Sequence, residues 1–159
     1  MSKVSAEIHI DAPREKVWDI LSDLGAVSVW NPVIANSYYT SEAKGGVGAG
    51  RHCDFPDGGY LGERVAEWEP GKALRLDIVE GSVPFDDFYG AYQLRSEGTG
   101  TVVTMTLGFE VKPGAPVEPS KAERQNREEL IPAVLAGLKH YAETGQPLAA
   151  PPTGGAARN

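Results

Sequence analysis

Hydrophobic and polar residues alternate along seven stretches of this chain, and a period of two predicts half-buried β-strands. The alternation is clearest near the end of the series, where Val103 and Met105 point to one face and Thr104 to the other. The predicted strands are residues 3–10, 33–40, 51–56, 60–69, 74–80, 87–96 and 101–111. A tight-turn sequence at residues 57–59 joins two of them, so we expect antiparallel neighbours there.

Helical spacing replaces the alternation after the last strand and predicts one amphipathic helix over residues 119–145. Its apolar positions are Leu130, Ile131, Val134, Leu138 and Tyr141. Ser120 and Glu123 have the spacing of a capping box at its start, and Gly145 supplies a stop. Pro132 removes one backbone hydrogen bond inside this helix, so we expect a kink there.

Two shorter helices are predicted between the first and second strands. The first begins at Pro13, a residue suited to the first helical position, and runs to about Ser22, while the second covers residues 24–30. A mostly antiparallel sheet needs its apolar face covered, and one long C-terminal helix can cover it. We therefore expect an α+β fold in which the sheet curls around this helix and leaves a lined cavity between them.

The domain organisation follows from length and composition. A chain of 159 residues is one domain by the usual relation between length and domain number, and we place that domain at residues 1–145. Residues 146–159 are rich in Pro, Gly and Ala and have no hydrophobic periodicity, so we predict a disordered tail.

Charge and composition argue against several classes of function. The formal net charge of −7, with scattered basic residues, argues against nucleic-acid binding. No apolar stretch approaches the ~20 residues that span a bilayer, so no membrane insertion is expected. The single cysteine, Cys53, excludes an internal disulfide and fits a reducing cytoplasm. His9, His52 and His140 lack metal-ligand spacing, so no metal site is predicted.

Short motifs that span residues 3–145 follow one another in the order found in a known superfamily. They are Ile10-Asp11-Ala12-Pro13 with Val17-Trp18, Trp30-Asn31-Pro32, Val47-Gly48-Ala49-Gly50-Arg51, Gly62-Glu63-Arg64-Val65, Glu80-Gly81-Ser82-Val83-Pro84 and Gly98-Thr99-Gly100-Thr101. The chain resembles the START-like SRPBCC superfamily, in its polyketide cyclase/dehydrase and lipid transport branch. The resemblance implies a helix-grip fold, in which a curved antiparallel sheet of about seven strands wraps around a long C-terminal helix, with two short helices after the first strand.

The resemblance implies that the cavity binds a small hydrophobic molecule, which is aromatic, polyketide-like or lipid-like, and that no cofactor takes part. Three functions stay open at this point. The chain is a non-catalytic binder or carrier, a cofactor-free polyketide cyclase or dehydratase that uses the same cavity, or an interaction module whose loops close over a ligand. We expect a monomer or a weak homodimer.

Strand parity places two charged residues beside the predicted cavity. Arg51 shares a face with Cys53, and Glu63 shares a face with Leu61. With the turn at residues 57–59, Cys53 is expected opposite Glu63 and Arg51 diagonal to it, at roughly 7–8 Å, which allows an inward ion pair. A shift of one residue in this strand would instead leave Glu63 in water.

An arginine in an apolar cavity would orient a carboxylate, an enolate or a carbonyl oxygen, and Glu63 would hold it in place or act as a base. A purely structural pair is the alternative. For cyclisation, the candidate catalytic residues are Arg51, Glu63 and Tyr92. The residues predicted to contact the ligand are Trp30, Arg51, Phe55, Glu63, Leu76, Phe85, Phe88, Tyr92, Met105, Phe109, Leu130, Val134 and Leu138.

Overall fold

The computed structural model describes residues 2–81, 85–111 and 121–148, with side chains for all of these except residues 2, 85–86, 111 and 121–128. The elements in chain order are β1 (Ser2–Ile10), α1 (Arg14–Ser22), the 3₁₀ turn η1 (Leu24–Ala26), α2 (Val27–Trp30), β2 (Asn36–Tyr39), β3 (Gly50–Asp54), β4 (Tyr60–Glu69), β5 (Ala73–Gly81), β6 (Phe85–Glu97), β7 (Gly100–Val111) and α3 (Lys121–Thr144). The predicted seven strands, two short helices and long C-terminal helix are confirmed.

The strands form one antiparallel sheet in the order β1-β7-β6-β5-β4-β3-β2. Consecutive strands from β2 to β7 are neighbours, and β1 pairs with β7 along residues 2–10 and 101–109. The two edges of the sheet are therefore β1 and the short β2. All of the pairings in the described residues are antiparallel, as the turn sequences predicted.

Three irregularities in the strand pairing bend this sheet. They lie at Gly62/Glu63 and Val65/Glu67 in the pairing of β4 with β5, and between Asp86 and Tyr89 in β6. A bulge bends its strand and increases the local twist, so these positions help to curl the sheet. The bulge after Val65 also reverses the parity of β4, and Trp68 can therefore pack its ring edge-on against Trp18 at a centroid distance of 5.2 Å.

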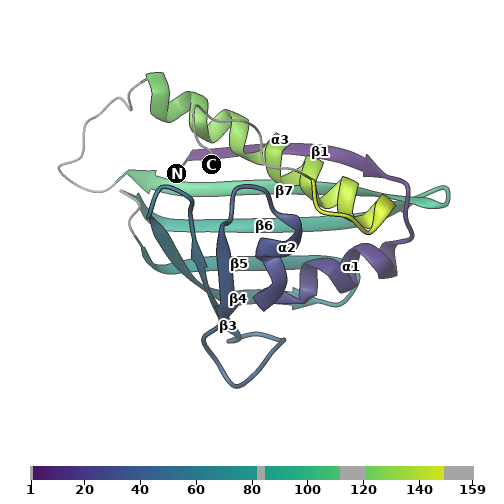
Figure 1. Ribbon diagram of the computed structural model, residues 1–159, viewed down its shortest axis with the longest axis horizontal. Coiled ribbons are helices and arrows are strands. Elements are labelled where there is room, and N and C mark those ends of the chain that lie inside the picture. The colour runs from purple at the N-terminus through teal and green to yellow at the C-terminus, as the bar shows by residue number, and fades with distance from the viewer. Residues whose placement is uncertain (1, 82–84, 112–120, 149–159) are drawn as a thin grey trace.

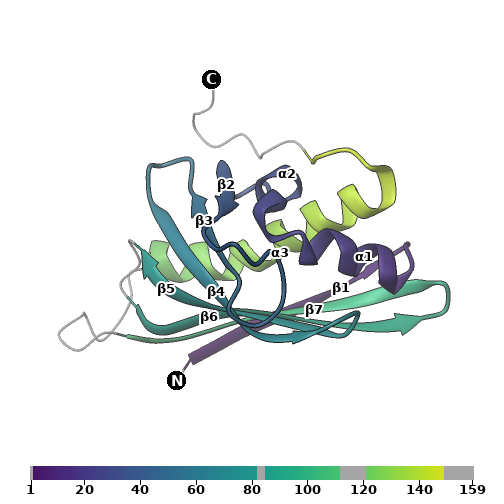
Figure 2. The same cartoon turned by 90° about the horizontal axis from the view of Figure 1, so that it is seen from below.

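The three helices lie on one side of the curved sheet (Figures 1 and 2). Helix α3 runs along β1 and β7 and also contacts α1 and α2. Its Ile131, Val134, Leu135 and Leu138 are buried against the sheet and form the centre of the core. This burial is the reason why the C-terminal segment folds as a helix here, because the amphipathic pattern presents one apolar face to the sheet.

Several predicted boundaries are wrong, two of them between β1 and β3. Pro13 is the N-cap of α1 and not its first helical residue, since its extended ψ of 152° lies outside the helix. Strand β2 starts at Asn36 and not at residue 33, because Ile34 N–H bonds to the carbonyl of Asn31 and the chain turns there.

Parts of several predictions lie outside the described residues. They are the capping box of Ser120 and Glu123 and the tail at residues 149–159. Pro132 does lie within α3, on its exposed side, and the kink stays a prediction. Among the described residues, none of the helices is long and apolar enough to cross a membrane.

Candidate functional site

A cavity of about 270 Å³ lies between the sheet and α3. Its walls come from α2 and the turn that follows it, from β3 to β7 and the turn after β3, and from Leu130 and Val134 on α3. Of the residues that we expected to contact a ligand, those that line this cavity are Arg51, Phe55, Glu63, Leu76, Phe88, Tyr92, Met105, Leu130 and Val134. The alternation along β3 to β7 thus brings side chains that are far apart in the sequence to one concave surface.

Three other predicted contacts are buried but do not line the cavity. Phe109 lies beside Phe88, with ring centroids 6.0 Å apart, and Phe88 is the one of the two that lines the cavity. Leu138 is fully buried in the core, and Trp30 is buried at the end of α2. The side chain of Phe85 lies outside the described residues.

The structure also adds lining residues that the sequence did not single out. They are Val27, Asn31, Val33, Ile34, Cys53, Leu61, Ile78, Gly90 and Leu107. For Cys53 and Leu61 the signal was present, because strand parity had already placed them on the inner face. Val33 and Ile34 belong to a turn, and no periodic pattern marks the inward side chains of a turn.

Arg51 and Glu63 form the inward ion pair that strand parity allowed. Arg51 Nε donates to Glu63 Oε1 at 2.8 Å, and both side chains are at least nine-tenths buried. The expected register was wrong by two residues: Arg51 lies directly opposite Glu63, and Cys53 lies opposite Leu61. The connecting loop is longer than predicted, because β3 ends at Asp54 and Phe55 N–H bonds to Gly59 O across the turn.

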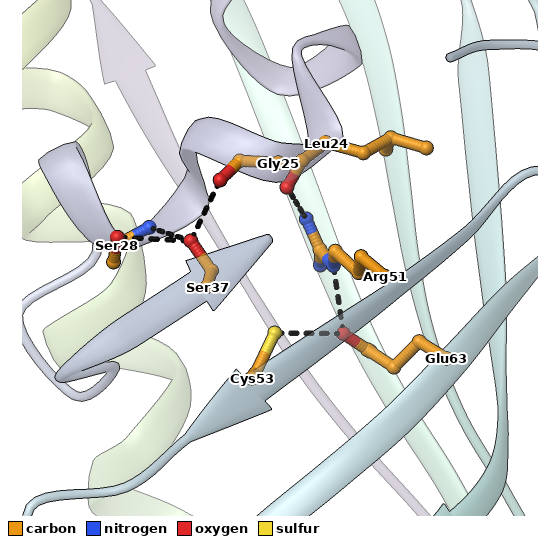
Figure 3. A network of polar contacts seen from close by, with 7 residues as sticks. All are labelled: Leu24, Gly25, Ser28, Ser37, Arg51, Cys53 and Glu63. Atoms are coloured by element: carbon orange, nitrogen blue, oxygen red, sulfur yellow. Dashed lines mark hydrogen bonds and ion pairs between the residues drawn. The ribbon is translucent and has the colours of Figure 1, made fainter. Parts of the chain in front are cut away.

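Further hydrogen bonds anchor this pair to the η1 turn (Figure 3). Arg51 Nη1 donates to the carbonyl oxygen of Leu24 at 3.3 Å, and the Cys53 thiol donates to Glu63 Oε1 at 3.5 Å. Ser37 on β2 ties the same turn to the sheet, because its hydroxyl donates to the Gly25 carbonyl at 2.8 Å. The η1 turn, which leads directly into the lining residue Val27 of α2, is thus fixed to β2 and β3.

The surroundings of the pair set the protonation of three groups. Burial is the largest single influence on Arg51 and works against its charge, but the attraction and hydrogen bond of Glu63, together with the acidic groups of Cys53 and Tyr92, outweigh it, so the pKa of the guanidinium is raised. Burial raises the pKa of the Cys53 thiol to about 12, against the opposing effect of Arg51. Burial likewise raises the pKa of the Tyr92 hydroxyl. At neutral pH the site therefore holds a charged arginine, a protonated thiol and a protonated phenol.

The cavity is partly open to solvent. Seven of its apolar lining side chains are half-buried: Val33, Ile34, Phe55, Leu61, Ile78, Phe88 and Leu130. The bulge in β6 includes Asp87, whose φ of 50° lies in the left-handed region, and Phe88 directly follows it. Trp18 and Leu21 of α1 fill the space between the helices and the sheet.

The chemistry available here is limited by these protonation states. A protonated thiol is a poor nucleophile, so Cys53 is not poised for covalent catalysis. The described residues contain no group of three His, Cys, Asp or Glu side chains that could hold a metal ion. What the site offers is an apolar surface with hydrogen-bonding groups gathered around one ion pair.

Comparisons with known proteins agree with this architecture. The family model described as "Polyketide cyclase / dehydrase and lipid transport" matches residues 1–143. No curated protein matches the sequence.

Several solved structures share the fold. A START superfamily protein from Mycobacterium smegmatis is 18% identical with a TM-score of 0.74, and the match covers 88% of this chain and 96% of that one. A protein from Thermus thermophilus is 23% identical with a TM-score of 0.73, over 89% and 97% of the two chains. The protein XoxI from Bacillus cereus is 21% identical with a TM-score of 0.72, over 88% and 94%. At these identities the similarity shows the fold alone.

Proposed function

The chain belongs to the polyketide cyclase / dehydrase and lipid transport family of START-like SRPBCC proteins, and on that premise we propose that it binds one small hydrophobic molecule in the cavity between the sheet and α3. Arg51 and Glu63 orient the polar end of this molecule. The apolar side chains of β5 to β7 and of α3 exclude water from the rest of it. The chain acts as a binder or carrier.

The observation that supports this function best is the composition of the cavity wall. Of the described residues that line it, only Arg51 and Glu63 carry a formal charge, and they are already paired with each other at 2.8 Å. Small-molecule sites have this character, with a mostly apolar surface and a few placed polar groups. When Leu76, Met105 and Val134 cover the apolar surface of a ligand, the binding free energy becomes more favourable by about 25 cal/mol for each Å² removed from water.

A cofactor-free cyclase would need a base that accepts a proton at neutral pH. Cys53 and Tyr92 keep their protons there, because burial raises the pKa of each. Glu63 remains as a base, but one of its oxygens already accepts two hydrogen bonds, from Arg51 and Cys53. These contacts favour binding over proton abstraction, so the binder is the function that we propose.

Cellular context is the second part of this proposal. Cys53 is a free, buried thiol, which supports action in a reducing cytoplasm. We propose a monomer or a weak homodimer, because the helices already cover the inner face of the sheet. Nucleic acid is not among the proposed partners, since the net charge is −7.

Cavity-filling substitution tests the binding site. The Met105→Trp variant places a larger side chain in the cavity, whereas Val79→Trp makes a similar change at a residue that is 51% exposed. We expect 2-ethylnaphthalene, followed by its fluorescence, to bind the wild type and Val79→Trp with one site per chain, and Met105→Trp at least tenfold more weakly. Binding to Met105→Trp as tight as binding to the wild type would contradict the proposal.

A further inference from the structure

Four polar groups on residues that line the cavity have unused hydrogen-bonding capacity. Within the described residues, Arg51 Nη2, Asn31 Nδ2 and the Tyr92 hydroxyl make no hydrogen bond, although Arg51 uses its Nε and Nη1 and Asn31 uses its Oδ1. Glu63 Oε2 is similarly unused, while Oε1 accepts from two donors. All four residues are at least nine-tenths buried. These four atoms keep contact with the accessible space of the cavity, since the fully buried side-chain atoms without a partner among the described residues are Arg14 Nε and Trp30 Nε1. A ligand that enters the cavity must therefore supply hydrogen-bond partners to them in place of water.

These groups belong to three different walls of the cavity. Asn31 follows α2, Arg51 and Glu63 pair across β3 and β4, and Tyr92 lies on β6. The charges of Arg51 and Glu63 both act on the titration of Tyr92, so its hydroxyl lies within electrostatic reach of the pair. Arg51, Glu63 and Tyr92 thus make up one polar region of the cavity, Asn31 adds a polar side chain from the turn after α2, and most of the remaining lining is apolar.

The formal charges in this region cancel. The Arg51 guanidinium is matched by the Glu63 carboxylate, and no other charged side chain lines the cavity within the described residues. A ligand with its own carboxylate or ammonium would bring an extra charge into a buried site without a counter-charge, which is unfavourable. An uncharged oxygen, in contrast, can accept from the unused N–H groups, and a hydroxyl can also donate to Glu63 Oε2.

The volume sets the size of the ligand. A cavity of about 270 Å³ has room for a small organic molecule. One or two fused rings with a short substituent have this size. A lipid with two acyl chains is several times larger and would leave most of its hydrocarbon outside.

Resting on the proposed function, we infer that the ligand of this cavity is a compact, uncharged molecule of one or two rings that carries a carbonyl or hydroxyl oxygen at its buried end. This oxygen lies among Asn31, Arg51, Glu63 and Tyr92. Free fatty acids and intact diacyl lipids are therefore not the ligands of this site.

Four probes of graded chemistry test the inference on the full chain. They are 2-acetylnaphthalene, which is neutral with a carbonyl, 2-ethylnaphthalene, which has nearly the same shape without one, 2-naphthoate, which is anionic, and palmitate. We expect the dissociation constant of 2-acetylnaphthalene to be about tenfold lower than that of 2-ethylnaphthalene, as hydrogen bonds to a charged donor allow. It should also be at least tenfold lower than those of 2-naphthoate and palmitate.

Two variants test which groups cause the preference. Replacing Arg51 and Glu63 together by Met removes the pair without leaving a lone charge, and should bring the two neutral naphthalenes to within about threefold of each other. Tyr92→Phe removes one hydroxyl with almost no change of shape. It should lower the preference for 2-acetylnaphthalene over 2-ethylnaphthalene about threefold. This variant keeps the test valid if the double variant does not fold. Tyr38→Phe is the matched control, because Tyr38 is 50% exposed and does not line the cavity.

The outcomes separate this inference from the function on which it rests. Three results would overturn the inference and leave a hydrophobic binding site. They are equal binding of the ethyl and acetyl probes, tighter binding of 2-naphthoate or palmitate, and a preference for the acetyl probe that is unchanged in both variants. Failure of all four probes to bind overturns the proposed function as well.

Discussion

A single buried ion pair defines the polar region of the cavity. Arg51 and Glu63 are withdrawn from water on opposite strands, and each satisfies the charge of the other. The desolvation of two such charges is recovered only while both are present. The desolvation cost therefore offsets much of the attraction between the two charges, and removal of either partner alone should be costly.

The Glu63→Gln variant tests this dependence. It leaves the buried Arg51 guanidinium without a counter-charge, so we expect the free energy of unfolding in urea to fall by about 3 kcal/mol. The exposed pair of Arg75 and Asp77 serves as the control, because Asp77→Asn should cost less than about 1 kcal/mol. Similar losses in the two variants would show that Arg51 is not held by the charge of Glu63.

The Cys53 thiol predicts a loss of stability at alkaline pH. In the unfolded chain this thiol ionises near its ordinary pKa of 9.0, whereas burial raises its pKa to about 12 in the folded chain. Above pH 9 the unfolded state therefore binds fewer protons, and the free energy of unfolding falls as the pH rises.

The difference between wild type and Cys53→Ala isolates this contribution. Between pH 8 and pH 10.5 we expect the wild type to lose about 1–2 kcal/mol more than the variant, since one unit of pKa corresponds to about 1.4 kcal/mol. Urea unfolding at a series of pH values measures it. Parallel profiles for the two proteins would mean that the thiol ionises equally in both states.

At the scale of elements, the position of α3 depends on close approach to the α2 segment. Gly137 lies against the ring of Pro32 and the carbonyl oxygen of Trp30, and a Cβ at this glycine would collide with both. One of these contacts is backbone, which cannot rotate away. Because residue 137 has no side chain, α3 can lie close against Trp30 and Pro32, and this position brings Val134 to the cavity.

Gly137→Ala should destabilise the protein even though alanine favours helices. Alanine gains up to about 1 kcal/mol in helix propensity, but we expect overpacking to outweigh it and the free energy of unfolding to fall by about 2 kcal/mol. Gly90→Ala is the comparison, because its Cβ would lie 3.6 Å from Leu107 Cδ2, an ordinary contact. A Gly137→Ala variant as stable as Gly90→Ala would contradict the packing of α3 on Pro32.

The elements themselves could be predicted well from the sequence. Each strand is half-buried, so alternation reports its two faces, and the bounds of β4 match the predicted residues 60–69. The inward direction of Arg51 followed from its parity with Cys53. The register of β3 with β4 could not be predicted in the same way, because it depends on the length of the loop, and local alternation does not report loop length.

At the scale of the whole molecule, the cavity could be predicted only in part. Leu76, Met105 and Val134 line the cavity and could be predicted, because they lie on strands and a helix whose inner faces show in the periodic pattern of hydrophobic residues. Asn31 and Ile34 line it from a turn, whereas Phe109 packs beside Phe88 and does not line it. Such details depend on tertiary packing and on bulges, which local sequence patterns do not encode.

The central claim, that a compact uncharged molecule binds between the sheet and α3, is tested most directly by intermolecular nuclear Overhauser effects. Methyl-labelled protein would be saturated with 2-acetylnaphthalene, and contacts from its ring protons to methyl groups would be recorded. We predict contacts to the methyls of Met105, Leu76 and Val134, which line the cavity. Contacts confined to the exposed Val47 and Val79 would place the molecule outside it and contradict the account.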